Sequence, residues 1–143
     1  MEKVYVVYWS QTGNTQAMAE AIGEGITEGG KEAIVIEVGN VSMEEIKMSQ
    51  VFALGCPAMG AEVLEEMEME PFVEEIESFV SGKKILLFGS YGWGDGQWMR
   101  DWEDRMRGAG ATLIHGEGVI CQELPDDEML AALKDVGKAM AQM

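Results

Sequence analysis

Cysteine and histidine are scarce in this chain, which contains two cysteines and one histidine. Cys56 and Cys121 do not form a Cys-x-x-Cys pair, and no second histidine or cysteine accompanies His115. Metal centres and dithiol motifs need such ligands at short spacing, so we expect no metal site. A disulfide between the cysteines is one alternative, but free thiols in a reducing, cytoplasmic setting are favoured.

Long hydrophobic runs are also missing. No apolar run approaches the roughly 20 residues that a membrane-spanning helix needs, and Met1-Glu2-Lys3 leads directly into a strand-like segment rather than a secretory leader. We therefore expect a cytoplasmic protein without a membrane partner. A chain of 143 residues can build a core with two layers of helix around a sheet, so a single domain is expected over residues 1–143.

Positive charge is in short supply. The chain carries 10 basic and 26 acidic residues, a formal net charge of −16. Such a chain repels nucleic acid and anionic membranes, and it favours partner proteins with basic docking surfaces. Eight glutamates lie between Glu62 and Glu77. They are either a solvated helix face or part of a docking surface.

What the chain does have is a regular alternation of apolar segments and helical periodicity. Strands are predicted at Val4–Trp9, Ala33–Val38, Val51–Gly55 and Lys84–Ser90, with short pieces at Thr112–Ile114 and Val119–Cys121. Helices are predicted at Asn14–Glu28, Glu70–Val80, Gln97–Arg107 and after Pro125, and Ser42-x-x-Glu45 predicts a capping box. Strands that are apolar throughout are typical of a parallel sheet covered on both faces. We therefore predict an α/β fold with right-handed crossovers and five strands in the order 2-1-3-4-5.

A hydroxyl-rich loop joins the first predicted strand to the first predicted helix. Its residues are Ser10, Gln11, Thr12, Gly13, Asn14 and Thr15. The amino end of a helix favours an anion, and the short polar side chains can donate to phosphate oxygens. No lysine or arginine occurs between Lys3 and Lys31, so a phosphate here would be held by neutral donors. The same residue types are also common in ordinary turns and caps.

Two further loops follow the third and fourth predicted strands, and the strand order brings all three loops to one edge of the sheet. One loop contains Pro57, Ala58, Met59, Gly60, Ala61 and Glu62, and the other contains Ser90, Tyr91, Gly92, Trp93, Gly94 and Asp95. Met59 and Trp93 offer surfaces for an aromatic ring, and Glu62 offers an acceptor. Together the three loops predict a site for a phosphorylated planar heterocycle.

The three loops resemble the flavin-binding motifs of a known family. Ser-x-Thr-Gly-Asn-Thr, Ala-Met-Gly with a following acid, and Gly-Ser-Tyr-Gly-Trp-Gly are similar to the phosphate loop and the two flavin loops of short-chain, clostridial-type flavodoxins. The resemblance covers essentially the whole chain. It implies a flavodoxin-like three-layer sandwich over residues 1–143 that binds FMN non-covalently.

The resemblance also implies residue roles. The phosphate would lie on Ser10–Thr15, Met59 and Trp93 would lie on the two ring faces, and Glu62 would accept from flavin N3–H. Backbone groups of Gly92 and its neighbours would contact the pyrimidine edge. A type II′ turn over Met59–Glu62 is expected, with positive φ at Gly60.

Two residues depart from the family pattern. Ala61 stands where relatives often have Asp or Ser, and Gln122 stands where an Asn is common near the flavin. These departures bear on the tuning of the redox potentials rather than on the identity of the cofactor.

The function implied is low-potential, one-electron transfer between partner proteins, with the flavin cycling between semiquinone and hydroquinone. We expect a monomer. We also expect no catalytic residues, since no nucleophile can be paired with a base. An FMN-dependent NAD(P)H:quinone reductase on the same fold is the alternative. A signalling receiver domain would need paired acids after the first strand, where Ser10 and Gln11 stand.

Overall fold

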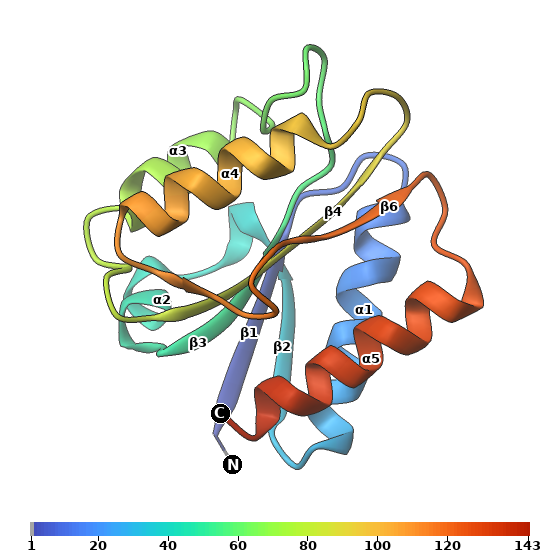
Figure 1. Cartoon of the computed structure of the whole chain (residues 1–143). Helices are drawn as coiled ribbons and strands as arrows, with labels where there is room; N and C mark the ends of the chain where they lie inside the picture. Colours follow the sequence, from blue (N-terminus) through green and yellow to red (C-terminus); the bar gives the residue numbers. More distant parts are fainter. Residues whose placement is uncertain (1) are drawn as a thin grey trace.

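A parallel sheet runs through the middle of the molecule, and the computed structural model describes it over residues 2–143 (Figure 1). Its strands are β1 (Lys3–Tyr8), β2 (Glu32–Glu37), β3 (Val51–Gly55), β4 (Lys84–Tyr91), β5 (Thr112–Leu113) and β6 (Val119–Gln122). The central strands consist mostly of Val, Ile, Leu, Phe and Tyr, the residues that fit a buried pleated surface.

The strand order is β2-β1-β3-β4-β5, which confirms the predicted order 2-1-3-4-5. The fifth position is shared by two short strands, because β5 pairs with Lys84–Ile85 of β4 and β6 pairs with Phe88–Tyr91. Between them the chain leaves the sheet at a turn in which His115 and Gly116 have φ of 72° and 80°. The last strand is therefore interrupted, and both of its parts, β5 and β6, pair with β4.

Helices cover both faces of the sheet. Helices α1 (Asn14–Glu28) and α5 (Asp127–Ala141) lie on one face, and α2 (Met43–Met48), α3 (Met69–Ile76) and α4 (Gln97–Gly108) lie on the other (Figure 1). A 3-10 turn (Val38–Asn40) follows β2. No helix formed by residues 2–143 is both long enough and apolar enough to cross a membrane. Both cysteines carry free thiols, so the disulfide alternative is wrong.

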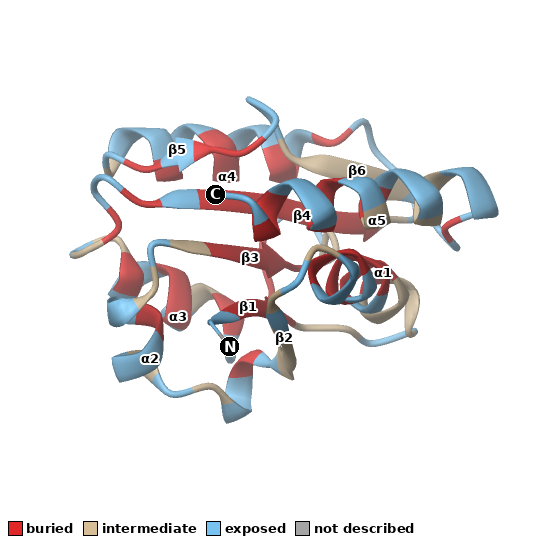
Figure 2. Cartoon of the chain, turned by 90° about the horizontal axis from the view of Figure 1, so that it is seen from below, coloured by how far each residue is buried: buried red, intermediate tan, exposed pale blue. Residues whose placement is uncertain are grey.

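The core is divided by the sheet into two clusters. Tyr5 and Val7 of β1 point into the cluster with α2, α3 and α4, whereas Val4 and Val6 point into the cluster with α1 and α5. This alternation follows from the two-residue period of a strand. Figure 2 shows the central strands β1, β3 and β4 coloured as buried, while the edge strands β2 and β6 are mostly intermediate.

Two local predictions are wrong. The helix predicted to reach Val80 ends at Ile76, because the chain tightens there into turns in which Ser78 and Phe79 donate to Glu75 and Ile76. Ser42 is the N-cap residue of α2, but its side chain makes no capping hydrogen bond within the described chain. The carboxylate of Glu45 accepts from the hydroxyl of Tyr5 instead, so a tertiary contact replaces the capping box.

Helices α1 and α5 pack closely because glycine lies at their contact. A Cβ at Gly137 would collide with the carbonyl oxygen of Ile22, and a Cβ at Gly25 would collide with that of Lys134. The two helix backbones approach more closely there than any larger residue allows. This close approach fixes α1, whose amino end belongs to the loop described next.

We expect Gly137→Ala to lower the free energy of unfolding by about 1–3 kcal/mol, because the added methyl group must push α5 away from α1. Gly108→Ala is the matched control: Gly108 is also helical, and a Cβ there meets no atom of the described chain within 4 Å. Urea unfolding of both variants and the parent measures the difference. Equal stability of the two variants would contradict the close contact.

Candidate functional site

A cavity of about 410 Å³ lies at the carboxyl ends of the strands, within the size range of small-molecule sites. Its lining comes from four segments that follow or end strands: Ser10, Gln11, Thr12, Asn14 and Thr15; Pro57, Ala58 and Met59; Ser90, Tyr91 and Gly92; and Glu123 and Leu124. The three loops that the sequence indicated therefore meet in one cavity. The fourth loop follows β6 and was not predicted.

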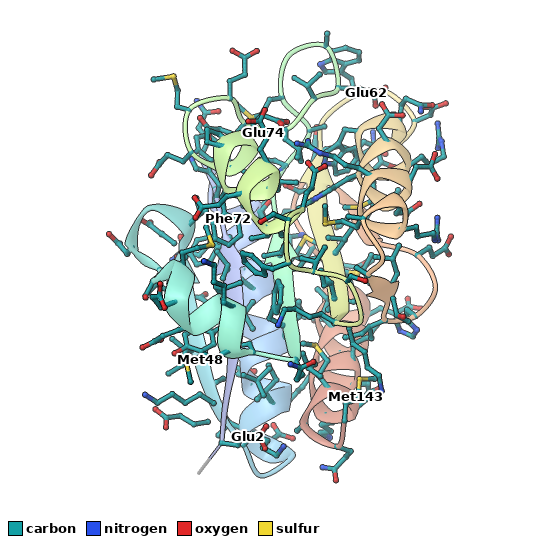
Figure 3. All side chains as sticks on the ribbon, turned by 90° about the vertical axis from the view of Figure 1, so that its left-hand side faces the viewer. Glu2, Met48, Glu62, Phe72, Glu74 and Met143 are labelled. Carbon is teal, nitrogen blue, oxygen red and sulfur yellow. The ribbon has the colours of Figure 1, made fainter. Side chains whose placement is uncertain are left out.

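A larger hollow of about 680 Å³ lies at the opposite end of the sheet. Glu2, Met48 and Met143 line it, and Figure 3 shows them at the end of the molecule away from Glu62. Open parallel sheets bind their ligands beyond the carboxyl ends of the strands. The glycine- and hydroxyl-rich loops also lie there, so the smaller cavity is the candidate site.

Ser10 organises the first loop. Its Oγ accepts the backbone N–H groups of Gly13 and Gln16 at 3.2 and 3.3 Å. Gly13 has φ of 97°, a left-handed conformation that suits glycine and that turns the chain into α1. A serine hydroxyl has two lone pairs and one proton. With its oxygen accepting from the backbone, Ser10 keeps its proton free to donate to a ligand.

The amino end of α1 is left open. The N-cap residue Gly13 has no side chain to cap this helix, Ser10 takes only the N–H of Gln16 from its first turn, and that turn contains no acidic residue. By contrast α5 is capped by Asp126, whose carboxylate accepts from the N–H of Met129 at 2.8 Å. The open end, with its orphan N–H groups, is suited to an anion from outside the chain. Neither lysine nor arginine occurs among the described residues that line the cavity.

Thr15 and Ser90 tie the first loop to the third. Their hydroxyl oxygens lie 2.8 Å apart, and the N–H of Ser90 donates to Thr15 Oγ1 at 3.4 Å. Both residues are buried, with 1% and 4% of their surface exposed. The two hydroxyls therefore fix the wall between the phosphate-like loop and the end of β4.

The second loop is a hairpin. Met59 and Val63 exchange two backbone hydrogen bonds of 2.9 and 3.0 Å across a three-residue tip. Positive φ at Gly60, which the predicted type II′ turn over Met59–Glu62 requires, is confirmed at 46°, and the backbone hydrogen bonds close the hairpin one residue beyond that turn, at Val63. Glu62, with φ of 57°, takes the left-handed place that ends such a three-residue loop. Gly60 and Ala61 are exposed at the tip and do not line the cavity.

Glu62 lies behind the loop that carries Trp93. Its Oε1 is buried and accepts no hydrogen bond from residues 2–143. A Cβ on Gly94 would collide with this oxygen, so the carboxylate lies directly against Gly94 (its place at the loop end is seen in Figure 3). A buried acceptor without a donor is costly. Glu62 does not line the cavity, and its buried oxygen at the meeting of the second and third loops is an acceptor that a donor from outside the chain would satisfy.

The third loop presents an indole to solvent. Trp93 is 66% exposed, whereas Tyr91 packs on the buried Trp98 with ring centroids 5.6 Å apart. Asp95 does not line the cavity, and its carboxylate pairs with Arg100 at 2.9 Å. Among the predicted residues of this loop, Ser90, Tyr91 and Gly92 line the cavity, and Trp93 stands free beside it.

Glu123 and Leu124 were missed by the sequence. Glu123 has φ of 59° and its N–H donates to Tyr91 at 2.8 Å, which brings the loop after β6 over the cavity. Gln122, which the resemblance placed near the flavin, donates from Nε2 to the carbonyl of Gly92 at 3.4 Å and does not line the cavity. The sequence could have indicated Glu123 and Leu124, because they follow a parallel strand, and the carboxyl end of every parallel strand reaches the edge of the sheet where the cavity lies.

The acidic run from Glu62 to Glu77 is not one uniform surface. Glu70 and Glu77 both pair with Arg105 at 2.6 Å. Glu65 is buried, with 6% of its surface exposed. The glutamates left facing solvent are Glu66, Glu68, Glu74 and Glu75.

The site can hold an anion and a planar group. No cluster of metal-binding side chains occurs among residues 2–143. Burial raises the pKa of the Cys56 thiol to about 12, so this cysteine is inert at neutral pH. The donor set fits a phosphate held by neutral groups together with a ring that carries an N–H donor.

Comparison with known proteins gives consistent matches. A family model described as Flavodoxin matches residues 6–135. A flavodoxin from Clostridium beijerinckii is 54% identical over 122 residues, which cover 85% of this chain and 88% of that protein. A flavodoxin from Megasphaera elsdenii is 41% identical over 138 residues, which cover 96% and 98%.

Solved structures agree. The solution structure of two-electron reduced Megasphaera elsdenii flavodoxin has a TM-score of 0.88 at 40% identity, with 98% of this chain and 99% of that chain covered. A flavodoxin from the domain Archaea has a TM-score of 0.87 at 33% identity, with 98% and 96% covered.

We expect Thr15→Val and Ser90→Ala each to destabilise the apoprotein by about 1–3 kcal/mol, because each leaves a buried hydroxyl or N–H without its partner. The double variant should lose less than the sum, with a coupling energy of about 1 kcal/mol. Urea unfolding of the four proteins measures the coupling. Thr27→Val, at an exposed threonine of α1, should show no coupling to Ser90→Ala, and additive losses for Thr15 and Ser90 would contradict the contact.

Proposed function

The chain belongs to the flavodoxin family, and from this premise we propose that the cavity at the carboxyl ends of the strands is the FMN site. The protein is an FMN-binding electron carrier. The cofactor supplies the one-electron chemistry when it is bound. The chain supplies the holding groups, the exclusion of water and the surface that meets other proteins.

The phosphate is held by Ser10–Thr15. The observation that carries this assignment is the open amino end of α1, next to hydroxyl groups and without a nearby cation. Ser10 donates its free hydroxyl proton, and Thr12 and Asn14, which line the same cavity, donate from their side chains. Hydrogen bonds to a charged acceptor are stronger than those to a neutral one, so several neutral donors suffice.

The second and third loops would hold the ring between them. Met59 lines the cavity and gives a polarizable surface for one ring face, while the exposed Trp93 covers the other. Glu62 accepts from the ring N3–H, which satisfies its buried Oε1. The remaining residues of these two loops give the loops their shape around the ring; they are Pro57, Ala58, Gly60, Ala61, Gly94 and Asp95.

Electron transfer rather than catalysis is the role we assign. The exposed hairpin tip and the exposed Trp93 would form the surface at which a partner meets the flavin. A quinone reductase would need an open substrate pocket on the face that Trp93 covers. No observation on residues 2–143 favours that alternative.

Partners dock at the flavin end through basic surfaces. Glu66, Glu68 and Glu74 are exposed on the elements that follow the hairpin, and Figure 3 shows Glu74 and Glu62 toward the same end of the molecule. The formal charge of −16 adds a long-range attraction for basic proteins. The free thiols are consistent with a reducing compartment, and we assign the protein to the cytoplasm.

We expect purified protein to be yellow, with one FMN per chain.

Thr12→Val should weaken FMN binding by about 1.5–3 kcal/mol, the cost of losing a hydrogen bond to a charged group. Riboflavin, which lacks the phosphate, should bind almost as before. Quenching of flavin fluorescence on titration with apoprotein measures both affinities, with Thr27→Val as the control at an exposed threonine. Equal weakening of both flavins would show that this loop does not hold the phosphate.

Electron transfer to a basic partner should slow as salt concentration rises, since exposed charges are screened. Glu66→Gln, Glu68→Gln and Glu74→Gln together should flatten that dependence. The control neutralises three exposed acids on the opposite face of the sheet: Glu20→Gln, Glu24→Gln and Asp135→Asn. Stopped-flow rates with a basic cytochrome over a salt series decide, and the same flattening in both sets would count against docking at the flavin end.

A further inference from the structure

One glutamate of the acidic run behaves unlike its neighbours. Glu65 is only 6% exposed, whereas Glu66 beside it is exposed. A buried carboxylate is costly unless it is hydrogen-bonded. The contacts of Glu65 therefore show what its burial accomplishes.

The carboxylate of Glu65 gathers three backbone N–H groups. Oε2 accepts from Met67 at 2.7 Å, and Oε1 accepts from Glu68 at 2.7 Å and from Met69 at 3.0 Å. Burial raises the pKa of Glu65, but the N–H groups of Met69, Glu68 and Met67 outweigh it and leave the pKa below its ordinary value. The carboxylate is thus ionised at neutral pH and holds the turn that leads into α3.

The flavin hairpin has two legs that are attached differently. The outgoing leg is bonded to β4, since Cys56 donates to Phe88 at 3.1 Å and Ala58 donates to Ser90 at 3.0 Å. The returning leg begins at Val63, which closes the hairpin with Met59, and reaches Glu65 two residues later. There the N–H of Glu65 points at Cys56 Sγ at 3.4 Å, and its carboxylate holds residues 67–69.

We propose that Glu65 is a positioning residue for flavin binding, which fixes the returning leg of the Met59–Val63 hairpin and so the place of Gly60–Glu62 over the ring. This role rests on the proposed FMN site. Glu65 does not line the cavity, and it acts through Val63 and the backbone of residues 67–69. Without its carboxylate, the outgoing leg stays bonded to β4, while the returning leg keeps only the bonds of Val63 to Met59 and the contact of the Glu65 N–H with Cys56 Sγ.

The role predicts a pattern of binding losses that differs from that of the phosphate loop. The hairpin meets the ring, which FMN and riboflavin share. Removing the Glu65 carboxylate should therefore lower the binding affinity for both flavins by the same factor. A substitution in the phosphate loop, Ser10–Thr15, should lower the affinity for FMN alone.

The test compares Glu65→Gln with Glu66→Gln, which removes the same charge from the exposed neighbour. An amide has one acceptor oxygen and one donor group, so the side chain of the Glu65→Gln variant cannot accept N–H groups on both sides. Amide hydrogen exchange of the apoprotein is measured at Met67, Glu68 and Met69. We expect exchange at these amides to be roughly tenfold faster in Glu65→Gln, and both flavins to bind roughly tenfold more weakly. Glu66→Gln should match the parent in each.

Two outcomes would overturn the role. One is a Glu65→Gln protein that is indistinguishable from Glu66→Gln, and the other is a loss confined to FMN. If Glu65→Gln does not fold, the parent apoprotein decides: the amide resonances of residues 67–69 should titrate together with one carboxyl of lowered pKa, and independent titration would refute the contacts. A parent that binds neither flavin would overturn the proposed function and this role with it.

Discussion

The shared direction of the strands is the constraint on which the rest of this molecule depends. Because β1, β3, β4 and β6 run parallel, their carboxyl ends reach one edge, and every loop that leaves them arrives at the same place. Burial on both faces by helices makes this arrangement rigid. The loops themselves then need few contacts with one another, and the hydroxyl pair of Thr15 and Ser90 is one of them.

The site solves an electrostatic problem. A chain with a formal charge of −16 holds an anionic cofactor, yet no cation from the described residues lines the cavity. The open end of α1 supplies oriented N–H dipoles, and Ser10 uses its oxygen to brace the loop while keeping its proton for the ligand. Local dipoles thus do what a lysine does in other phosphate loops, and the protein keeps its negative surface.

The sequence predicted the strand order, the first helix and the meeting of three loops, because these follow from hydrophobic period and from the rule for parallel sheets. It did not predict features that depend on where backbone groups point. Glu65 is one of eight similar glutamates, and only the direction of three N–H groups makes it a buried anchor. Glu45 likewise has the right spacing for a capping box but meets Tyr5, a residue 40 positions away. Glu123 lines the cavity because the last strand is divided into β5 and β6. The two short apolar segments of the sequence indicated two strand pieces but not where the chain after the second piece would lie.

The hairpin with two anchored legs and a free tip has an evolutionary consequence. A Cβ at Gly60 meets no described atom within 4 Å, and Ala61 is exposed, so side chains at the tip touch little of the folded chain. The legs, by contrast, are bound into β4 and into the turn before α3. Substitutions at Ala61 should therefore cost little stability. The tip of the hairpin can therefore vary in sequence without disturbing the fold, whereas its two roots are tied to the sheet and to α3.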